Sequence, residues 1–179
     1  MDSIQVNDSV ATALVLLDNH LKHKVKVVTD YDPELPKVSC TSELHQVWTN
    51  LITNASEAIA ERTDRVAGEV HIATRRSGES VAVTITDNGV GIPAGDPDRI
   101  FDPFFTTKDI GKGTGLGLCI VSGIIKRHQG TIRVDSVPGR TTFEIDDPDL
   151  ARGRERVGRG RRRRDRRVSP PSSTEKKAA

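Results

Sequence analysis

The sequence predicts a single α/β domain followed by a polar C-terminal extension. Apolar residues recur at spacings of three and four between about 42 and 62, which is the pattern of an amphipathic helix. Two segments of alternating apolar residues, 70–86 and 131–145, each contain a glycine turn and are typical of β-hairpins. A chain of 179 residues is long enough for one such domain with an appendage.

The predicted helices span about residues 8–20, 42–62 and 114–128. Asn7 or Asp8 is expected to cap the first helix, because short polar side chains accept the free N–H groups of a helix start. The middle helix has the most complete apolar stripe, formed by Leu44, Val47, Trp48, Leu51, Ile52, Ala55, Ala58 and Ile59.

The predicted strands lie between and after these helices. A valine-rich strand at 25–28 is followed by a turn with two prolines and a short strand at 38–40. The two hairpins turn at 77–79 and at 138–140. Their strands are expected at 70–74, 81–86, 131–137 and 141–145.

Residues 93–113 have no sustained period of either kind. A long segment without regular structure inside a compact domain is usually functional or disordered. Because this segment lies between two glycine-rich loops, we expect residues 94–112 to form a mobile lid over a ligand. It includes Pro93, Gly95, Pro97, Pro103, Gly111 and Gly113.

Composition excludes secreted and membrane-spanning classes. The two cysteines, Cys40 and Cys119, have neither metal-ligand nor disulfide-framework spacing, which fits a reducing cytosol. The longest apolar run, 10–17, is too short to span a bilayer, and no signal-peptide pattern opens the chain. We therefore expect a cytoplasmic protein without a membrane segment.

The net charge of +2 conceals a division along the chain. Residues 150–179 contain 12 Lys or Arg and 3 Asp or Glu, a net of +9, whereas residues 1–149 contain 15 and 22, a net of −7. The extension has no apolar face, so burial cannot offset the entropy of ordering it, and we expect a disordered tail. A solvated tail without a dedicated role is the simplest interpretation. Nucleic-acid binding through counterion release is an alternative, although no aromatic residues interleave to stack on bases.

Two glycine-punctuated loops carry the strongest chemical signal. They are DNGVGIP at 87–93 and GKGTGLGL at 111–118. Glycine lets the backbone approach a ligand closely, and a glycine-rich loop at a helix start presents free N–H groups to an anion. Asp87 ends a strand, where its carboxylate can accept a hydrogen bond from a base such as adenine. The loops therefore predict a nucleotide site, with one loop for the base and the other for the phosphates.

Asn50 and Asn54 are four residues apart in the 42–62 helix and so share a face. A side-chain carbonyl oxygen of Asn54 could coordinate Mg²⁺, a hard cation that takes oxygen ligands. Taken alone, the two residues are better explained by local hydrogen bonds on a polar helix face.

Four segments together resemble the catalytic and ATP-binding domain of histidine kinases. NLITNA at 50–55 looks like the N box, DNGVG at 87–91 the G1 box, FDPFFTTK at 101–108 the F box and GTGLGL at 113–118 the G2 box. The resemblance covers about residues 7–146 and extends to the GHKL superfamily of gyrase, heat-shock chaperone, histidine kinase and MutL. It implies a two-layer α/β sandwich of the Bergerat type. A mixed sheet would be backed by about three helices, with ATP held between the N-box helix and a flexible lid.

The resemblance also implies roles for individual residues. Asn54 would bind Mg²⁺, and Asn50 would support the metal and phosphate side; these two are the catalytic candidates. Asp87 would accept a hydrogen bond from the adenine amino group, and Thr141 would reach the adenine edge through water. The remaining ATP-binding candidates are Gly89, Gly91, Lys108, Gly113, Thr114, Gly115, Leu116, Gly117 and Leu118.

Three departures from the family pattern narrow the implied function. Asn50 replaces the glutamate that activates water in the ATPases of the superfamily, and an amide is no general base, which favours phosphoryl transfer over hydrolysis. Glu57 stands where many histidine kinases have a lysine, and we place it on exposed helix surface. The final strand ends in the acidic segment 144–148 instead of an apolar run, which leaves the C-terminal boundary open.

None of the five histidines has the acidic neighbour and the proline four residues later that mark a phosphoacceptor histidine. His128 is expected to be a local structural residue, and His45 to lie on the exposed side of its helix.

The resemblance therefore implies the ATP·Mg²⁺-binding catalytic domain of a two-component sensor histidine kinase, at residues 1–149, with the basic tail at 150–179. The γ-phosphate would pass to a histidine on a dimerisation domain or on a split-kinase partner, with a response regulator downstream. The alternatives are a serine kinase resembling the anti-sigma-factor kinases, and an adaptor that binds ATP without transferring phosphate, with a tail for nucleic acid.

Overall fold

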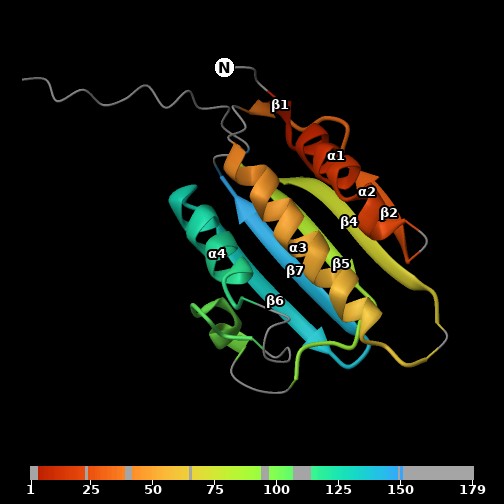
Figure 1. Cartoon of the computed structure of the whole chain (residues 1–179). Helices are drawn as coiled ribbons and strands as arrows, with labels where there is room; N and C mark the ends of the chain where they lie inside the picture. Colours follow the sequence, from red (N-terminus) through yellow and green to blue (C-terminus); the bar gives the residue numbers. More distant parts are fainter. Residues whose placement is uncertain are drawn as a thin grey trace, which may run out of the picture.

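Five strands form one mixed sheet, and the helices lie on one of its faces (Figure 1). In spatial order the strands are β2 (Val25–Tyr31), β4 (Gly68–Ser77), β5 (Ser80–Asp87), β7 (Arg140–Asp147) and β6 (Thr131–Val137). β2 and β4 are parallel, and the other neighbours are antiparallel. This structure, a computed structural model, describes residues 4–22, 24–38, 42–64, 66–93, 97–106, 114–148 and 150.

The longer helices pack side by side across the sheet (Figure 1). This two-layer α/β sandwich confirms the predicted fold class. None of the helices in the described ranges is both long enough and apolar enough to cross a bilayer. The helices are α1 (Val6–Leu16), α2 (Asp18–Leu21), α3 (Ser42–Ala60), α4 (Gly117–Arg127) and the 3-10 helix η1 (Pro97–Phe101), and a separate antiparallel pair joins β1 (Ile4–Gln5) to β3 (Lys37–Val38).

The core lies between the sheet and α3, as the apolar stripe predicts. Alternation along β5 directs Val81, Val83 and Ile85 to the helix side, where they are almost completely buried. Most of the predicted α3 stripe is buried there too, including Leu51, and Trp48 is wholly buried. Each large apolar side chain removed from water in this way stabilises the fold by about 1.5 to 3 kcal/mol.

The first helix differs from the prediction at both ends. It begins after Gln5, not at Asn7 or Asp8, and the chain breaks at Leu17 before α2. Asn7 is not a cap because its side chain has tertiary partners. Its amide donates to the Asp32 carbonyl at 2.7 Å, and its oxygen accepts from the Thr74 hydroxyl at 2.8 Å.

The acidic end of the last strand belongs to the sheet. Asp147 is fully buried and lies 3.0 Å from Nδ1 of His128, at the C-terminus of α4. The other carboxylate oxygen accepts the Leu150 N–H at 3.4 Å, and Leu150 itself is buried. His128 is therefore structural, as expected, and the folded body extends to at least Leu150. The predicted tail beyond it lies outside the described residues.

His45 was expected on the exposed side of α3, and this expectation is wrong. Its Nε2 atom is buried, and it has no hydrogen-bond partner in the described part of the chain. The residue lies three positions before Trp48, on the side of α3 that faces α1. A residue on the face of a helix that packs against a second helix is shielded from solvent even when its side chain is polar.

Ser9 and Trp48 join α1 to α3 through a buried hydrogen bond of 3.0 Å from the indole N–H to the hydroxyl. Ser9→Ala is expected to lower the free energy of unfolding by about 1 to 3 kcal/mol, because it leaves that N–H without this acceptor in a site closed to water. Urea denaturation measures the change. Thr12→Ala, which removes an exposed hydroxyl of the same helix, is the control and should change stability by less than about 0.5 kcal/mol. Equal denaturation midpoints for wild type and Ser9→Ala would contradict this account.

Candidate functional site

A cavity of about 380 Å³ opens between α3, the start of α4 and the adjoining ends of β5 and β7. A volume of this size is within the range of small-molecule sites in proteins, roughly 300 to 1,000 Å³. Its walls combine apolar residues with amides, hydroxyls and carboxylates. They are formed by Asn50, Thr53, Asn54, Ala55, Glu57, Ala58, Glu61, Asp87, Val90, Gly91, Ile92, Ile100, Phe105, Thr106, Thr114, Gly115, Gly117, Leu118, Thr141 and Phe143.

The floor of the cavity is made by two adjacent strand ends. Asp87 and Thr141 are partners in the β5–β7 register, and both continue the helix-facing side of their strands. Both residues are almost completely buried. The Thr141 hydroxyl lies 3.0 Å from the hydroxyl of Ser136. The alternation of buried and exposed side chains along each strand thus continues for one residue past the apolar core, and that residue is polar.

Asp87 is a carboxylate in a largely apolar setting. Its Oδ1 accepts the N–H of Gly89 at 2.8 Å, and Oδ2 has no hydrogen-bond partner in the described part of the chain. Burial raises the pKa of Asp87 from 3.8 to about 6, because the charged form loses solvation that the one N–H replaces only in part. One oxygen that lines the cavity is therefore left for a donor on a ligand.

The loop after Asp87 needs glycine because it approaches other backbone segments closely. A Cβ on Gly89 would lie 2.7 Å from Ala58 on α3. Gly91 has φ +84°, and a Cβ there would lie 2.4 Å from the carbonyl oxygen of Val137. The loop therefore packs tightly between the end of α3 and the β6–β7 turn. This packing fixes the position of Asp87.

The polar face of α3 forms the opposite wall. Asn50 and Asn54 both line the cavity, as their spacing predicts, and the Asn50 amide donates to the Gly117 carbonyl at 3.4 Å. Glu57 and Glu61 lie on the same face and also line the cavity. Our placement of Glu57 on exposed surface is therefore wrong. It is half-buried, since positions 50, 54, 57 and 61 share one side of a helix.

The G2 segment forms a tight turn into α4. Gly115 has φ +64°, and its carbonyl accepts the N–H of Phe104 at 2.9 Å. The hydroxyl of Thr114 accepts the Leu116 N–H at 3.4 Å, and the helix then starts at Gly117, three residues later than predicted. Because Gly117 lines the cavity, the N-terminus of α4 faces it with N–H groups that no helical carbonyl satisfies.

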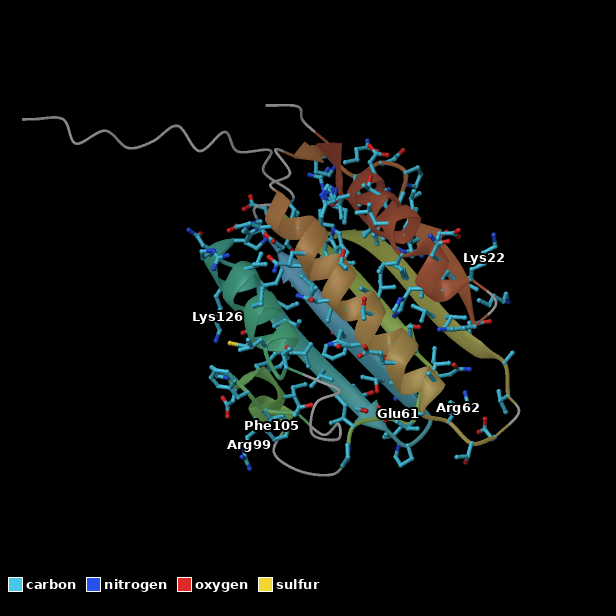
Figure 2. All side chains as sticks on the ribbon, viewed as in Figure 1. Lys22, Glu61, Arg62, Arg99, Phe105 and Lys126 are labelled. Carbon is cyan, nitrogen blue, oxygen red and sulfur yellow. The ribbon has the colours of Figure 1, made fainter. Side chains whose placement is uncertain are left out.

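Part of the segment expected to be a mobile lid is regular and docked. Residues 97–101 form η1, which packs on α4 and buries Ile100. The guanidinium of Arg99 lies 5.3 Å from the ring centre of Phe105, a residue that lines the cavity (Figure 2). Of the other lid positions, 94–96 and 107–112 lie outside the described residues, and so do the candidates Lys108 and Gly113.

Residues 40–152 match the protein family described as histidine kinase-, DNA gyrase B-, and HSP90-like ATPase. The chain belongs to this family. ATP is the nucleotide that the domain of this family binds. The match confirms the resemblance to this family that the four sequence motifs indicated.

Curated relatives and solved structures agree with this assignment. The signal transduction histidine-protein kinase AtoS of Escherichia coli (strain K12) is 39% identical over 158 residues, which are 86% of this chain and 25% of AtoS. The sensory histidine kinase/phosphatase NtrB of Rhizobium leguminosarum bv. phaseoli is 38% identical over 145 residues, 73% of this chain and 37% of NtrB. The catalytic domain of the histidine kinase ThkA superposes with a TM-score of 0.70 at 30% identity, covering 83% of this chain and 97% of that domain. This chain thus spans well under half the length of AtoS and of NtrB, and it covers nearly all of the ThkA catalytic domain.

The structure brings most candidate residues of this ATPase-family domain to one cavity. Gly89 lies beneath α3 and Leu116 in the turn, and neither is among the lining residues. The sequence analysis missed Glu61, although it follows Asn54 by seven residues on the same face, and it missed Val90 and Ile92, which no polar pattern marks. The candidates that do line the cavity are Asn50, Asn54, Asp87, Gly91, Thr114, Gly115, Gly117, Leu118 and Thr141.

Burial of Asp87 is expected to destabilise the protein without nucleotide. Because its folded pKa is raised from 3.8 to about 6, the folded protein holds this proton more tightly than the unfolded chain. The loss of stability is therefore absent below the unfolded pKa, grows as the pH rises and is complete above the folded pKa. Asp87→Asn keeps an acceptor for Gly89 and removes the charge, so it should stabilise the protein by about 2 to 3 kcal/mol near pH 8 and by little near pH 4. Urea denaturation at both pH values measures this, and a gain that did not depend on pH would contradict it.

Proposed function

We propose that this chain is the ATP-binding catalytic domain of a two-component sensor histidine kinase, and that it holds ATP for transfer of the γ-phosphate to a histidine. The observation that carries the proposal is the composition of one cavity. It joins a buried carboxylate with a spare acceptor, an asparagine-bearing helix face and a helix N-terminus. Each of these three features suits a different part of a nucleotide.

The base would lie at the strand ends. Oδ2 of Asp87 is the acceptor for an exocyclic amino group such as that of adenine, and the apolar residues Ile92 and Phe143 would contact the ring. The phosphates would lie at the start of α4, where Gly115 and Gly117 leave room and the helix N-terminus favours negative charge. Thr141 would contact the base through water, Gly113 would present its backbone N–H to the phosphates, and Lys108 would act from the lid.

The cavity fits a divalent cation together with the phosphates. Among the described lining residues, the ionisable side chains are the acids Glu57, Glu61 and Asp87, with no lysine or arginine. A polyphosphate would therefore meet net negative charge unless it arrived with a metal. Asn54 offers a hard oxygen ligand of the kind Mg²⁺ takes, and Asn50 would support it. The ion would supply charge neutralisation at the phosphates.

Transfer is favoured over hydrolysis because no general base lies beside the phosphate end among the residues that the structure describes. Asn50 lies there, and its amide already donates to the Gly117 carbonyl. The carboxylates of α3 lie towards its other end, since Glu57 is seven residues on, about 10 Å along the helix axis. The protein would mainly position the nucleotide and neutralise charge, which a loose phosphoryl-transfer transition state requires.

The histidine that receives the phosphate would come from a dimerisation domain or from a split-kinase partner. None of the histidines in the described part of the chain lines the cavity: His128 is paired with Asp147, and His45 is on the far side of α3. A response regulator would act downstream, in the cytoplasm. ThkA, whose catalytic domain has this fold, has been solved in complex with the response regulator protein TrrA.

ATP affinity is expected to fall as the pH drops through about 6. Protonation of Asp87 replaces an acceptor with a donor, so below its pKa the affinity should fall about tenfold per pH unit. Calorimetric titration with ATP at saturating Mg²⁺ measures the profile. Asp87→Asn should bind ATP about 10- to 100-fold more weakly near pH 8, because the amide turns its NH₂ towards the base, and its profile should lack this step. An unchanged affinity in Asp87→Asn would remove the residue from the site.

Phosphoryl transfer is tested by incubating the chain with labelled ATP, Mg²⁺ and the dimerisation domain of a related sensor kinase. Acid-labile label on that domain is expected, since phosphohistidine hydrolyses in acid. Asn54→Ala should abolish the label and the Mg²⁺-dependent part of ATP binding. Thr49→Ala, on the same helix, is the control and should retain both, because the Thr49 hydroxyl donates to the His45 carbonyl and the residue does not line the cavity. Acid-stable label would favour a serine kinase, and label on no protein would favour an adaptor that only binds ATP.

A further inference from the structure

The C-terminal end of α3 is tied to the loop that follows Asp87. In a regular helix the N–H of Arg62 would donate to the carbonyl of Ala58, four residues earlier. It donates instead to Ile59 at 3.1 Å, and the Ala58 carbonyl accepts the N–H of Val90 at 3.1 Å. The last turn of the helix is thus tightened, and a carbonyl that the helix leaves free becomes the anchor of the loop.

The side chain of Arg62 makes a second connection to the same loop. Its side chain is only 12% exposed, and Nη1 donates to the carbonyl oxygen of Asn88 at 2.5 Å. Nη2 holds the carboxylate of Asp64 at 2.6 and 2.7 Å, which fixes the guanidinium plane. Figure 2 shows Arg62 at the end of α3, next to Glu61.

The peptide unit between Asn88 and Gly89 lies between Arg62 and Asp87. Its carbonyl accepts from the Arg62 guanidinium at 2.5 Å, and its N–H donates to Oδ1 of Asp87 at 2.8 Å. A hydrogen bond to the carbonyl of an amide makes the N–H of that amide a stronger donor. The Arg62 charge therefore strengthens the one hydrogen bond that Asp87 receives.

The rest of the loop leaves this peptide little freedom. The Asn88 side chain accepts the N–H of Glu69 at 2.8 Å and donates to the Ala67 carbonyl at 2.9 Å. On the other side, Gly89 touches Ala58 too closely to admit a Cβ. The side chain of Asn88 and the packing of Gly89 restrain the residues on either side of this peptide bond. Among the described residues, Arg62 alone bonds the Asn88 carbonyl.

We infer that Arg62 is a positioning residue for base recognition: acting through the Asn88 carbonyl, it orients Asp87 and favours the carboxylate form. This role rests on the proposed function, in which Asp87 accepts a hydrogen bond from the base. It also couples the two ends of the nucleotide, because the helix that carries Asn54 ends at the residues that hold the loop after Asp87, residues 88–93, which we call the base loop. A purely structural arginine would not change the pH at which Asp87 titrates.

The surroundings of Asp87 contain few other charges that could produce the same effect. From α3, Glu57 and Glu61 share the cavity, and as acids they cannot favour the charged form of Asp87. From the neighbouring strands, the register partners Val70 and Thr141 do not ionise. Glu69 on β4 is paired with Lys26 on β2. Among the described residues, Arg62 is therefore the cation connected to Asp87.

The test compares the pH profile of ATP affinity in Arg62→Gln, Arg62→Lys and wild type. Arg62→Gln is expected to bind ATP about tenfold more weakly near pH 8 and to shift the midpoint of the profile upward by about half a unit, because Asp87 loses support for its charged form. Arg62→Lys keeps a charged donor for Asn88 and should recover most of both effects. Arg75→Gln is the matched control, because Arg75 also pairs with an aspartate, Asp30, and donates to a backbone carbonyl, but on the other side of the sheet from the cavity.

The outcomes separate this role from the proposed function. Wild type that binds no ATP at any pH would reject nucleotide binding and this role with it. Wild type that binds, with Arg62→Gln matching it in affinity and midpoint, would overturn the role of Arg62 alone. If Arg62→Gln does not fold, Asp64→Asn decides, since Asp64 is exposed and, among the described residues, accepts only the N–H of Val66 besides the guanidinium, and the amide oxygen of Asn remains an acceptor for that N–H. A loss of about threefold in ATP affinity would support the role, and wild-type affinity would overturn it.

Discussion

The burial of one carboxylate at the end of β5 affects both the stability of this domain and its binding site. Asp87 occupies a position that the alternation of its strand assigns to the core, and it receives a single hydrogen bond there. A charge in such a setting is unfavourable until a ligand donor completes its solvation. The domain is thus less stable without ligand than its core would allow, and a ligand with an amino group in the right place recovers that stability. Strain or desolvation of this kind is common where a protein keeps a site ready for binding.

Helix α3 holds the other parts of the site in relation to that carboxylate. Near its middle, Trp48 bonds α1 and Asn50 bonds the start of α4, and at its end Ala58 and Arg62 hold the base loop. A helix is stiff and rises about 1.5 Å per residue, so the distance between the asparagine face and the base loop is set by the chain itself. In the proposed binding mode, this one helix therefore determines how far apart the two ends of the nucleotide lie.

Electrostatics give the two ends of the cavity different characters. At the end that contains Asp87 the described ionisable side chains are acidic, whereas at the other end the N-terminus of α4 presents partial positive charge from its backbone. Backbone N–H groups and a metal can hold phosphate without any lysine or arginine in the described wall. Two arginines of the described structure contact residues of the cavity's surroundings instead of lining it: Arg62 bonds the loop after Asp87, and Arg99 lies against Phe105.

The sequence by itself determined the fold class, the approximate position of the main strands and helices and nine of the twenty residues that line the site. These depend on local patterns: the period of two in β5, the apolar stripe of α3 and the glycine spacing of the two loops. Only the tertiary structure decided that Asn7 bonds Thr74 instead of capping α1, that Glu57 faces the cavity, that η1 docks on α4 and that Arg62 reaches Asn88. Each of these depends on contacts between segments distant in the chain, where a partner becomes available only after the layers have packed.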